Sequence, residues 1–286
     1  MKAKGGRRKA GGSGLRRCAA LASRLLATSA FLLPPSALLF AAHPFITDDA
    51  GTQGAGSWQL ELMAQQNRHD ATAGPVQQRS RLTLLNPVLT YGLFETVDLA
   101  LGLNYARNRV SENGLSVDSA SGLSDTTLEL KWRFYDADGW SFAVKPAISL
   151  PTGDENRGLG LGRTSWGINL IADYDVKPWA WFANLAYFHP RFERAQDAAE
   201  LRDHLWRVSA GATYAVRENV WLAGELGVRT NEGRNDPFFP GRRSQYAMLG
   251  LIYSPAEKID LDIGLRKGLN RAETDTAFLV GATFRW

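Results

Sequence analysis

From residue 57 to the carboxyl terminus, segments of about ten residues alternate apolar and polar side chains, and this pattern constrains the fold more than any other feature. Trp58, Leu60 and Leu62, for example, alternate with Gln59 and Glu61. A period of two places the two kinds of side chain on opposite faces of a strand. Strands of soluble domains average about five or six residues, whereas about ten residues cross a membrane as a tilted strand. The pattern therefore predicts membrane-spanning strands.

The number and spacing of these segments indicate a barrel. They cover residues 57–67, 80–91, 97–107, 124–135, 140–150, 164–175, 179–188, 204–215, 219–229, 244–254, 258–267 and 276–286. The connections alternate long and short, at about 12, 5, 16, 4, 13, 3, 15, 3, 14, 3 and 8 residues. Outer-membrane barrels have an even strand number, short periplasmic turns and longer extracellular loops. We therefore predict an all-β, transmembrane, antiparallel up-and-down β-barrel of about 12 strands over residues 57–286.

The direction of each face follows from the bilayer. Side chains that meet lipid must be apolar, so we expect the apolar residues to point outward and the polar ones into the lumen. Aromatic residues such as Tyr91, Trp140 and Trp179 lie near strand ends, as in interfacial girdles. The last strand alternates apolar residues and ends at Trp286. Outer-membrane precursors commonly end this way, so we expect lipid and the barrel assembly machinery as partners.

Residues 1–42 are predicted to form a signal peptide that is removed after export. They contain eight Lys or Arg and no acidic residue, followed by an apolar run from Leu25 to Ala42. A transmembrane anchor is the alternative, but Pro34 and Pro35 interrupt the run. Subtracting those eight from the 33 Lys and Arg leaves 25 against 29 Asp and Glu, so no nucleic-acid partner is expected. Cys18, the one cysteine, lies in this leader, which excludes disulfides from the mature protein.

Several short motifs resemble a known family. The most specific is HPFITDDAGTQG at residues 43–54; the others lie at 122–125, 130–134, 150–154, 264–270 and 281–286. Together they are similar to the outer-membrane transporters named for the MetA pathway of phenol degradation. The resemblance implies a porin-like channel or transporter in the outer membrane of a Gram-negative bacterium. The name of the pathway suggests hydrophobic or aromatic small molecules as cargo.

Charged residues on the polar faces are predicted to line the lumen in balance. The acids are Glu61, Asp98, Glu129, Asp173, Glu225, Asp260 and Asp262, and the bases are Lys131, Arg133, Lys145, Arg207, Arg229, Arg266 and Arg285. An unpaired charge away from water is costly, so seven acids against seven bases favour ion-paired rungs across a narrow interior. A solute path lined by the same groups is the alternative.

Residues 43–56 precede the first strand and are rich in glycine after Asp49. We expect this N-terminal segment in the periplasm, either as a partial plug of the lumen or as a tether. Its motif contains His43, Pro44, Thr47, Asp48 and Asp49. One histidine and two adjacent acids match no established metal site, so neither a metal nor a cofactor is expected.

We predict a passive channel or transporter for small, hydrophobic or aromatic solutes and no catalytic residue. A structural or adhesive barrel without transport is one alternative, in which long loops bind a partner and Phe238 and Phe239 form an exposed pair that caps the barrel or contacts a ligand. A lipase or protease is the less favoured alternative, because the chain has no Gly-x-Ser-x-Gly motif. Its four histidines, His43, His69, His189 and His204, are expected in the N-terminal tail and in or beside loops.

Overall fold

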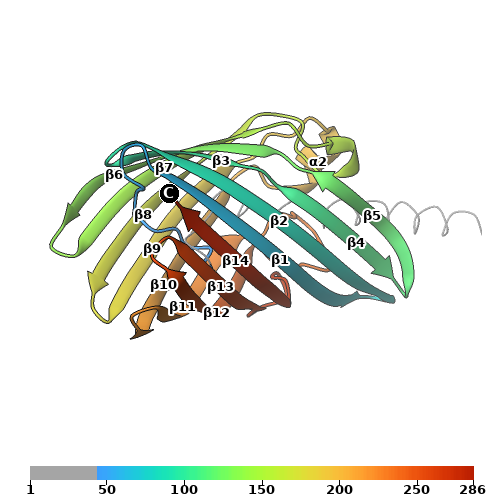
Figure 1. Ribbon diagram of the computed structural model, residues 1–286. Coiled ribbons are helices and arrows are strands. Elements are labelled where there is room, and N and C mark those ends of the chain that lie inside the picture. The colour runs from blue at the N-terminus through green and yellow to red at the C-terminus, as the bar shows by residue number, and fades with distance from the viewer. Residues whose placement is uncertain (1–43) are drawn as a thin grey trace, which may run out of the picture.

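The computed structural model describes residues 44–286, so His43 and the predicted signal peptide lie outside the described part of the chain. Residues 58–285 form a closed antiparallel β-barrel (Figure 1). β1 pairs with both β2 and β14, which closes the sheet on itself. No helix in residues 44–286 is long and apolar enough to cross a membrane.

The barrel wall consists of 14 labelled strands. They are β1 (Trp58–Ala73), β2 (Val76–Phe94), β3 (Val97–Gly102), β4 (Tyr105–Glu112), β5 (Leu115–Leu123), β6 (Thr126–Ala137), β7 (Trp140–Leu150), β8 (Ser165–Val176), β9 (Trp179–His189), β10 (Leu205–Arg217), β11 (Val220–Thr230), β12 (Arg243–Ala256), β13 (Ile259–Gly268) and β14 (Thr276–Arg285). β3 and β4 both pair with β2 and form one pass, interrupted at residues 103–104. β5 and β6 form one pass interrupted at residues 124–125. The wall therefore has the 12 passes that the sequence predicts.

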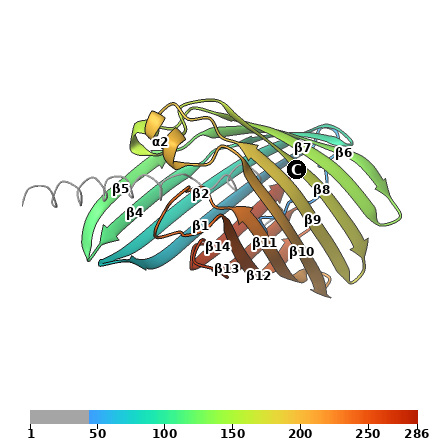
Figure 2. The ribbon, with the colours of Figure 1, turned by 180° about the vertical axis from the view of Figure 1, so that it is seen from behind.

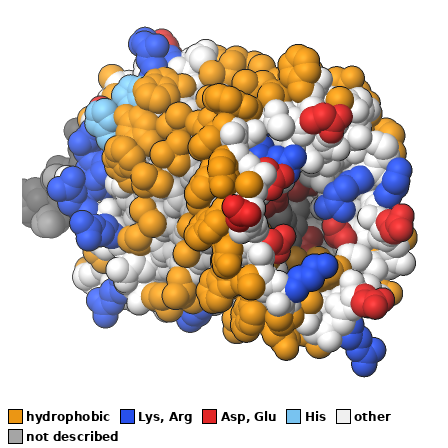
Figure 3. Space-filling model, turned by 90° about the vertical axis from the view of Figure 1, so that its left-hand side faces the viewer, with side chains coloured by type: hydrophobic (Ala, Val, Ile, Leu, Met, Phe, Trp, Pro, Cys, Tyr) orange, Lys and Arg blue, Asp and Glu red, His pale blue; other side chains and the backbone are white. Residues whose placement is uncertain are grey.

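Side chains alternate across the wall as expected. On β6, Leu130 and Trp132 are exposed on the outer surface, whereas Glu129 and Lys131 face inward. Figure 3 shows the resulting hydrophobic surface beside a hollow whose rim carries charged side chains. Rings pack near the strand ends, as in the pair Trp179 and Tyr214 with centroids 4.8 Å apart. The outer face is thus suited to lipid.

One end of the barrel has only tight turns. Residues 95–96, 138–139, 177–178, 218–219 and 257–258 each connect two strands at this end. Trp58 and Trp286 also meet here, where each backbone N–H donates to the carbonyl of the other at 3.0 Å. Short turns are periplasmic in outer-membrane barrels, so we call this the periplasmic end.

The opposite end differs from the prediction at two places. Residues 68–79 and 108–123 were expected to be long loops, but β1 and β2 continue to a turn at 74–75, and β4 and β5 to a turn at 113–114. These extensions carry polar side chains on both faces, so the alternation of apolar residues ends while the backbone ladder continues. The other loops, 151–164, 190–204, 231–242 and 269–275, contain only two helical turns, η2 (Glu155–Arg157) and α2 (Ala195–Glu200). Figure 2 shows α2 at the same end as the β4–β5 hairpin.

Candidate functional site

The N-terminal segment lies inside the barrel, where residues 44–50 are buried or nearly so. The Phe45 side chain packs against Met248 and Leu279, and its ring centroid lies 5.7 Å from that of Phe182. Pro44 occupies space that a Cβ atom at Gly250 would fill. The tip of the segment therefore fits a hollow in the inner wall of β9 to β14.

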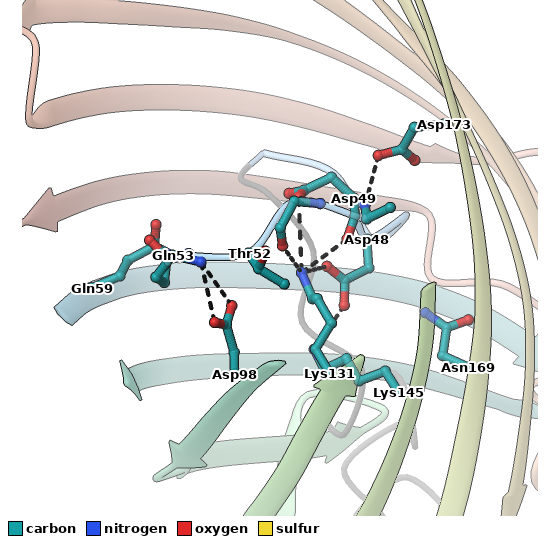
Figure 4. A network of polar contacts seen from close by, with 12 residues as sticks. Asp48, Asp49, Thr52, Gln53, Gln59, Asp98, Lys131, Lys145, Asn169 and Asp173 are labelled. Carbon is teal, nitrogen blue, oxygen red and sulfur yellow. Dashed lines mark hydrogen bonds and ion pairs between the residues drawn. The ribbon is translucent and has the colours of Figure 1, made fainter. Parts of the chain in front are cut away.

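Inward side chains of the wall hold the backbone of this segment. A buried backbone N–H needs an acceptor, and a segment outside a sheet must find one in side chains. Glu225 accepts from two successive N–H groups at 2.8 and 3.2 Å, Asn184 from one at 2.7 Å, Asp173 from one at 2.6 Å and Asp98 from one at 3.1 Å. The donors are Ile46, Thr47, Asp48, Ala50 and Gln53. Figure 4 shows the contacts of Asp98 and Asp173 with this segment.

Asp48 is the electrostatic centre of this contact. Its carboxylate lies 3.0 Å from the Lys131 ammonium and 2.7 Å from that of Lys145, which also contacts Glu129 at 2.6 Å. Burial would raise the pKa of the Asp48 carboxyl, but the two ammonium groups outweigh burial and lower it. Lys131 also donates to the Asp49 carbonyl at 2.8 Å. The N-terminal segment is therefore held as an anion between two wall lysines.

An internal cavity of about 420 Å³ lies beside this contact, on the side of the short turns. Seven acidic and three basic residues line it: Asp48, Asp49, Glu61, Asp98, Glu129, Asp260 and Asp262 with Lys131, Lys145 and Arg285. One of these ion pairs, Arg285 with Asp260, spans 2.6 Å. The periplasmic half of the lumen is therefore acidic.

Three of the predicted arginines lie nearer the other end of the lumen. Arg229 pairs with Glu273 at 2.9 Å, and the Arg266 guanidinium lies 5.6 Å from the centroid of the Tyr246 ring. None of the Arg207 guanidinium nitrogens has a hydrogen-bond partner among residues 44–286. Tyr246 donates to Glu225 at 2.6 Å. Basic groups thus gather in the extracellular half.

The predicted lumen charges meet only in part as pairs across the wall. Lys145 with Glu129 and Arg285 with Asp260 do so, whereas Arg133 pairs with Asp136 of its own strand at 3.1 Å. Lys131 is paired by the N-terminal segment and Arg229 by loop 269–275. Four partners in the lumen were not predicted from the sequence: Asn184, Ser209, Tyr246 and Glu273. Polar residues on the inward face of an apolar strand, such as Asn184, were the available signal.

Two extracellular loops fold into the mouth. Phe238 is buried, contrary to the expected exposed pair. Its carbonyl oxygen lies 3.0 Å from Nε2 of His69, and the Phe239 ring stacks on that imidazole with centroids 3.9 Å apart. His69 itself lies on β1, not in a loop. Leu159 of loop 151–164 packs against Leu84. These contacts narrow the entrance from outside.

The remaining histidines lie near the ends of β9 and β10. The Nδ1 atom of His189 is 2.6 Å from the Asp203 carbonyl, and that of His204 is 2.6 Å from the Tyr187 hydroxyl. No group of three or more His, Cys, Asp or Glu suited to a metal ion occurs within the described range.

The family model described as "Putative MetA-pathway of phenol degradation" matches residues 41–286. The chain belongs to this family. No curated protein sequence shows a significant match to this family member.

Solved structures share the fold of this family member. The COG4313 outer membrane channel from Pseudomonas putida F1 is 18% identical to this chain, with a TM-score of 0.62. The match covers 83% of this chain and 98% of the channel's chain. The NanC porin is 12% identical to this chain, with a TM-score of 0.51, and the match covers 79% of this chain and 98% of the porin's chain. The barrel architecture is therefore that of known outer-membrane channels.

Proposed function

We propose that this family member is a passive outer-membrane channel for small solutes, and that residues 44–56 plug its lumen at rest. The observation that carries the proposal is a closed barrel with an apolar exterior, a charged lumen and a 420 Å³ cavity beside a segment that is not part of the wall. Wall side chains hold most of this segment. Its displacement would leave the strand ladder intact and enlarge the cavity into a path.

The lining supports a class of cargo. Barrels become wide aqueous channels only at roughly 16 strands, so 12 passes enclose a narrow path. Two of the seven acids around the cavity, Asp48 and Asp49, belong to the plug, so the wall itself places five acids against three bases there. This excess favours neutral and cationic solutes over anions in the periplasmic half of the path. A phenol is small, polar and uncharged at neutral pH, so the lining does not repel the aromatic cargo that the family description suggests.

The two alternatives receive less support. An adhesive role would use Phe238 and Phe239, but Phe238 is buried inside the loop. A hydrolytic role would need a histidine that substrate can reach. His69 lies 3.5 Å from Asp275, but its ring is buried, stacks on Phe239 and contacts a backbone carbonyl. The Nδ1 atoms of His189 and His204 contact a backbone carbonyl and the Tyr187 hydroxyl. We propose no catalytic residue, and the fold shared with channels is consistent with that.

The test is single-channel conductance of the refolded mature protein in planar bilayers. We expect rare openings for the wild type and frequent stepwise openings for a variant that lacks residues 44–53. Proteoliposomes should swell in a small sugar faster than liposomes without protein do, and for phenol the protein-dependent excess in rate is the quantity to compare. A salt gradient should show only a weak preference for cations, because the acidic periplasmic half of the path is in series with the basic extracellular half. Barrels that keep heat-modifiable mobility but neither conduct nor swell, in both forms, would refute transport.

A further inference from the structure

A row of basic side chains crosses the outer surface of the barrel near its extracellular end. Lys267 lies opposite Thr276, Thr276 opposite Arg68, Arg68 opposite Arg81, and Arg81 opposite Arg109. Five neighbouring strands, β13, β14, β1, β2 and β4, therefore place four cations on one rung. We call Lys267, Arg68, Arg81 and Arg109 the basic row.

The basic row faces outward. Arg68, Arg109 and Lys267 are exposed and Arg81 is half-buried, whereas the alternate residues His69 and Asn108 are buried in the barrel. Arg79 and Arg107 lie on the same face on the two adjacent rungs. Six basic side chains thus share one strip of the surface.

Little negative charge balances this strip. Two acids lie beside this strip. Asp70 contacts Arg79 and Arg81 at 3.2 Å each, and Asp275, next to Thr276, accepts from the Asp70 N–H at 2.7 Å and lies 3.5 Å from His69. Arg68, Arg109 and Lys267 have no ion pair within the part of the chain described here. Like charges directly opposite each other on a sheet are destabilising. The row is therefore suited to an anion from outside the chain.

The position of the basic row along the barrel axis indicates which kind of anion it meets. Four residues toward the periplasm along the same strands, the outward positions are all apolar: Ile263, Val280, Ala64, Leu85 and Tyr105. That offset is about 13 Å along a strand, and less along the barrel axis because the strands are tilted. The cations therefore lie just beyond the edge of the lipid-facing surface. Arg68, Arg81 and Arg109 stand where β1, β2 and β4 extend past the rest of the wall (Figure 1), and Lys267 stands near the end of β13.

Lys267 also borders an apolar hollow of about 960 Å³ in the outer wall. Outward side chains such as Leu265, Leu249 and Leu226 line it, together with small residues that leave the wall thin. A cation at the border of an apolar hollow matches a lipid with a phosphate group and acyl chains.

We propose that the basic row binds the phosphate groups of a phosphorylated glycolipid of the outer leaflet, lipopolysaccharide, whose acyl chains lie on the apolar surface below. The guanidinium group matches phosphate geometry with two parallel hydrogen bonds, which suits arginine for this role. The inference rests on the outer-membrane location and is independent of transport.

The experiment is native mass spectrometry of the refolded mature barrel with bis-phosphorylated lipid A. Each basic side chain beside an anionic lipid contributes roughly fivefold, so Arg68→Gln/Arg81→Gln/Arg109→Gln should weaken binding about 100-fold. The matched control, Lys177→Gln/Arg217→Gln/Lys258→Gln, removes three charges at the periplasmic end and should bind as the wild type does. Lysine at the three arginine positions should retain part of the affinity.

Two lipids separate the possible outcomes. Dephosphorylated lipid A should bind as weakly to the wild type as lipid A binds to the glutamine triple variant. Phosphatidylglycerol should compete poorly, because it presents one phosphate and no glycolipid headgroup. Equal binding by the triple variant, equal binding of dephosphorylated lipid A, or full competition by phosphatidylglycerol would each overturn the proposal. Heat-modifiable mobility of every variant confirms that the barrels are folded.

Discussion

Replacing Asp48 with asparagine should release the N-terminal segment from the lumen. The carboxylate is buried between Lys131 and Lys145, at 3.0 and 2.7 Å, and asparagine removes its charge but keeps its shape. Loss of one partner of a buried ion pair costs about 3–5 kcal/mol. Glu129 still neutralises Lys145. We therefore use the lower value, about 3 kcal/mol, which changes the ratio of closed to open channels by about 100-fold.

The assay is the open probability of single channels in planar bilayers. Asp49→Asn is the matched control, because Asp49 is half-buried and lies 3.8 Å from Lys131. It should raise the open probability less than about fivefold, as expected for a partly exposed pair worth under about 1 kcal/mol. An Asp48→Asn barrel that is folded but opens no more often than the wild type would refute the plug.

The pH dependence of the wild type tests the same contact. The pKa of Asp48 is lowered in the folded protein, since the ammonium groups outweigh burial. Because the pKa is lowered, the ionised carboxylate stabilises the docked segment at every pH above the ordinary carboxyl pKa of about 4. This contribution is lost as the pH falls through the lowered pKa of the docked state. Titration of Asp48 should therefore leave the open probability unchanged from pH 7 to pH 5 and raise it only below about pH 4.

Three further predictions concern other parts of the barrel. Gly92→Ala should raise the open probability in bilayer recordings, because the added Cβ would overlap the Gly54 carbonyl. Gly224→Ala should leave the open probability unchanged, since its Cβ would meet a side chain only at 3.7 Å, and equal effects of the two variants would contradict this reasoning. Phe238→Ala removes a buried ring and should destabilise the folded loop by about 3–5 kcal/mol. Proteolysis of loop 231–242 should then be faster than in the wild type, and an unchanged rate would exclude the effect. Leu249→Arg, on the lipid face, should destabilise the barrel by about 2–4 kcal/mol, whereas Leu269→Arg in a loop should be near neutral. Urea unfolding of the two variants in vesicles tests this, and equal transition midpoints would place Leu249 outside the bilayer.

The barrel could be predicted because the bilayer forces every spanning strand to separate apolar from polar residues. Leu130 and Trp132 point outward and Glu129 inward for that reason. The constraint ends where a strand leaves the membrane. Arg68 and Arg81 face each other in a regular ladder, yet nothing in their polarity distinguishes that ladder from a loop. Strand ends beyond the bilayer were therefore the least predictable part of the fold.

Contacts within the lumen were harder to predict than the wall. Charge balance indicates that inward groups find partners but not which ones, because the pairing depends on register across the barrel and on segments outside the wall. Lys131 is paired by Asp48, 83 residues away, and Arg229 by Glu273, 44 residues away. Neutral acceptors such as Asn184 carry no charge signal at all, although this residue holds the Asp48 N–H.

The attachment of the N-terminal segment to β1 sets how the proposed channel would close again. Thirteen residues, 44–56, precede β1 with only Ser57 between, and they can extend no more than about 45 Å, so a released segment stays close to its own lumen. A short flexible link keeps the effective local concentration in the millimolar range. Reclosing is then a first-order process, independent of protein concentration and of any partner. Each opening should therefore end by itself, with a dwell time set by the chain and shortened by a shorter link.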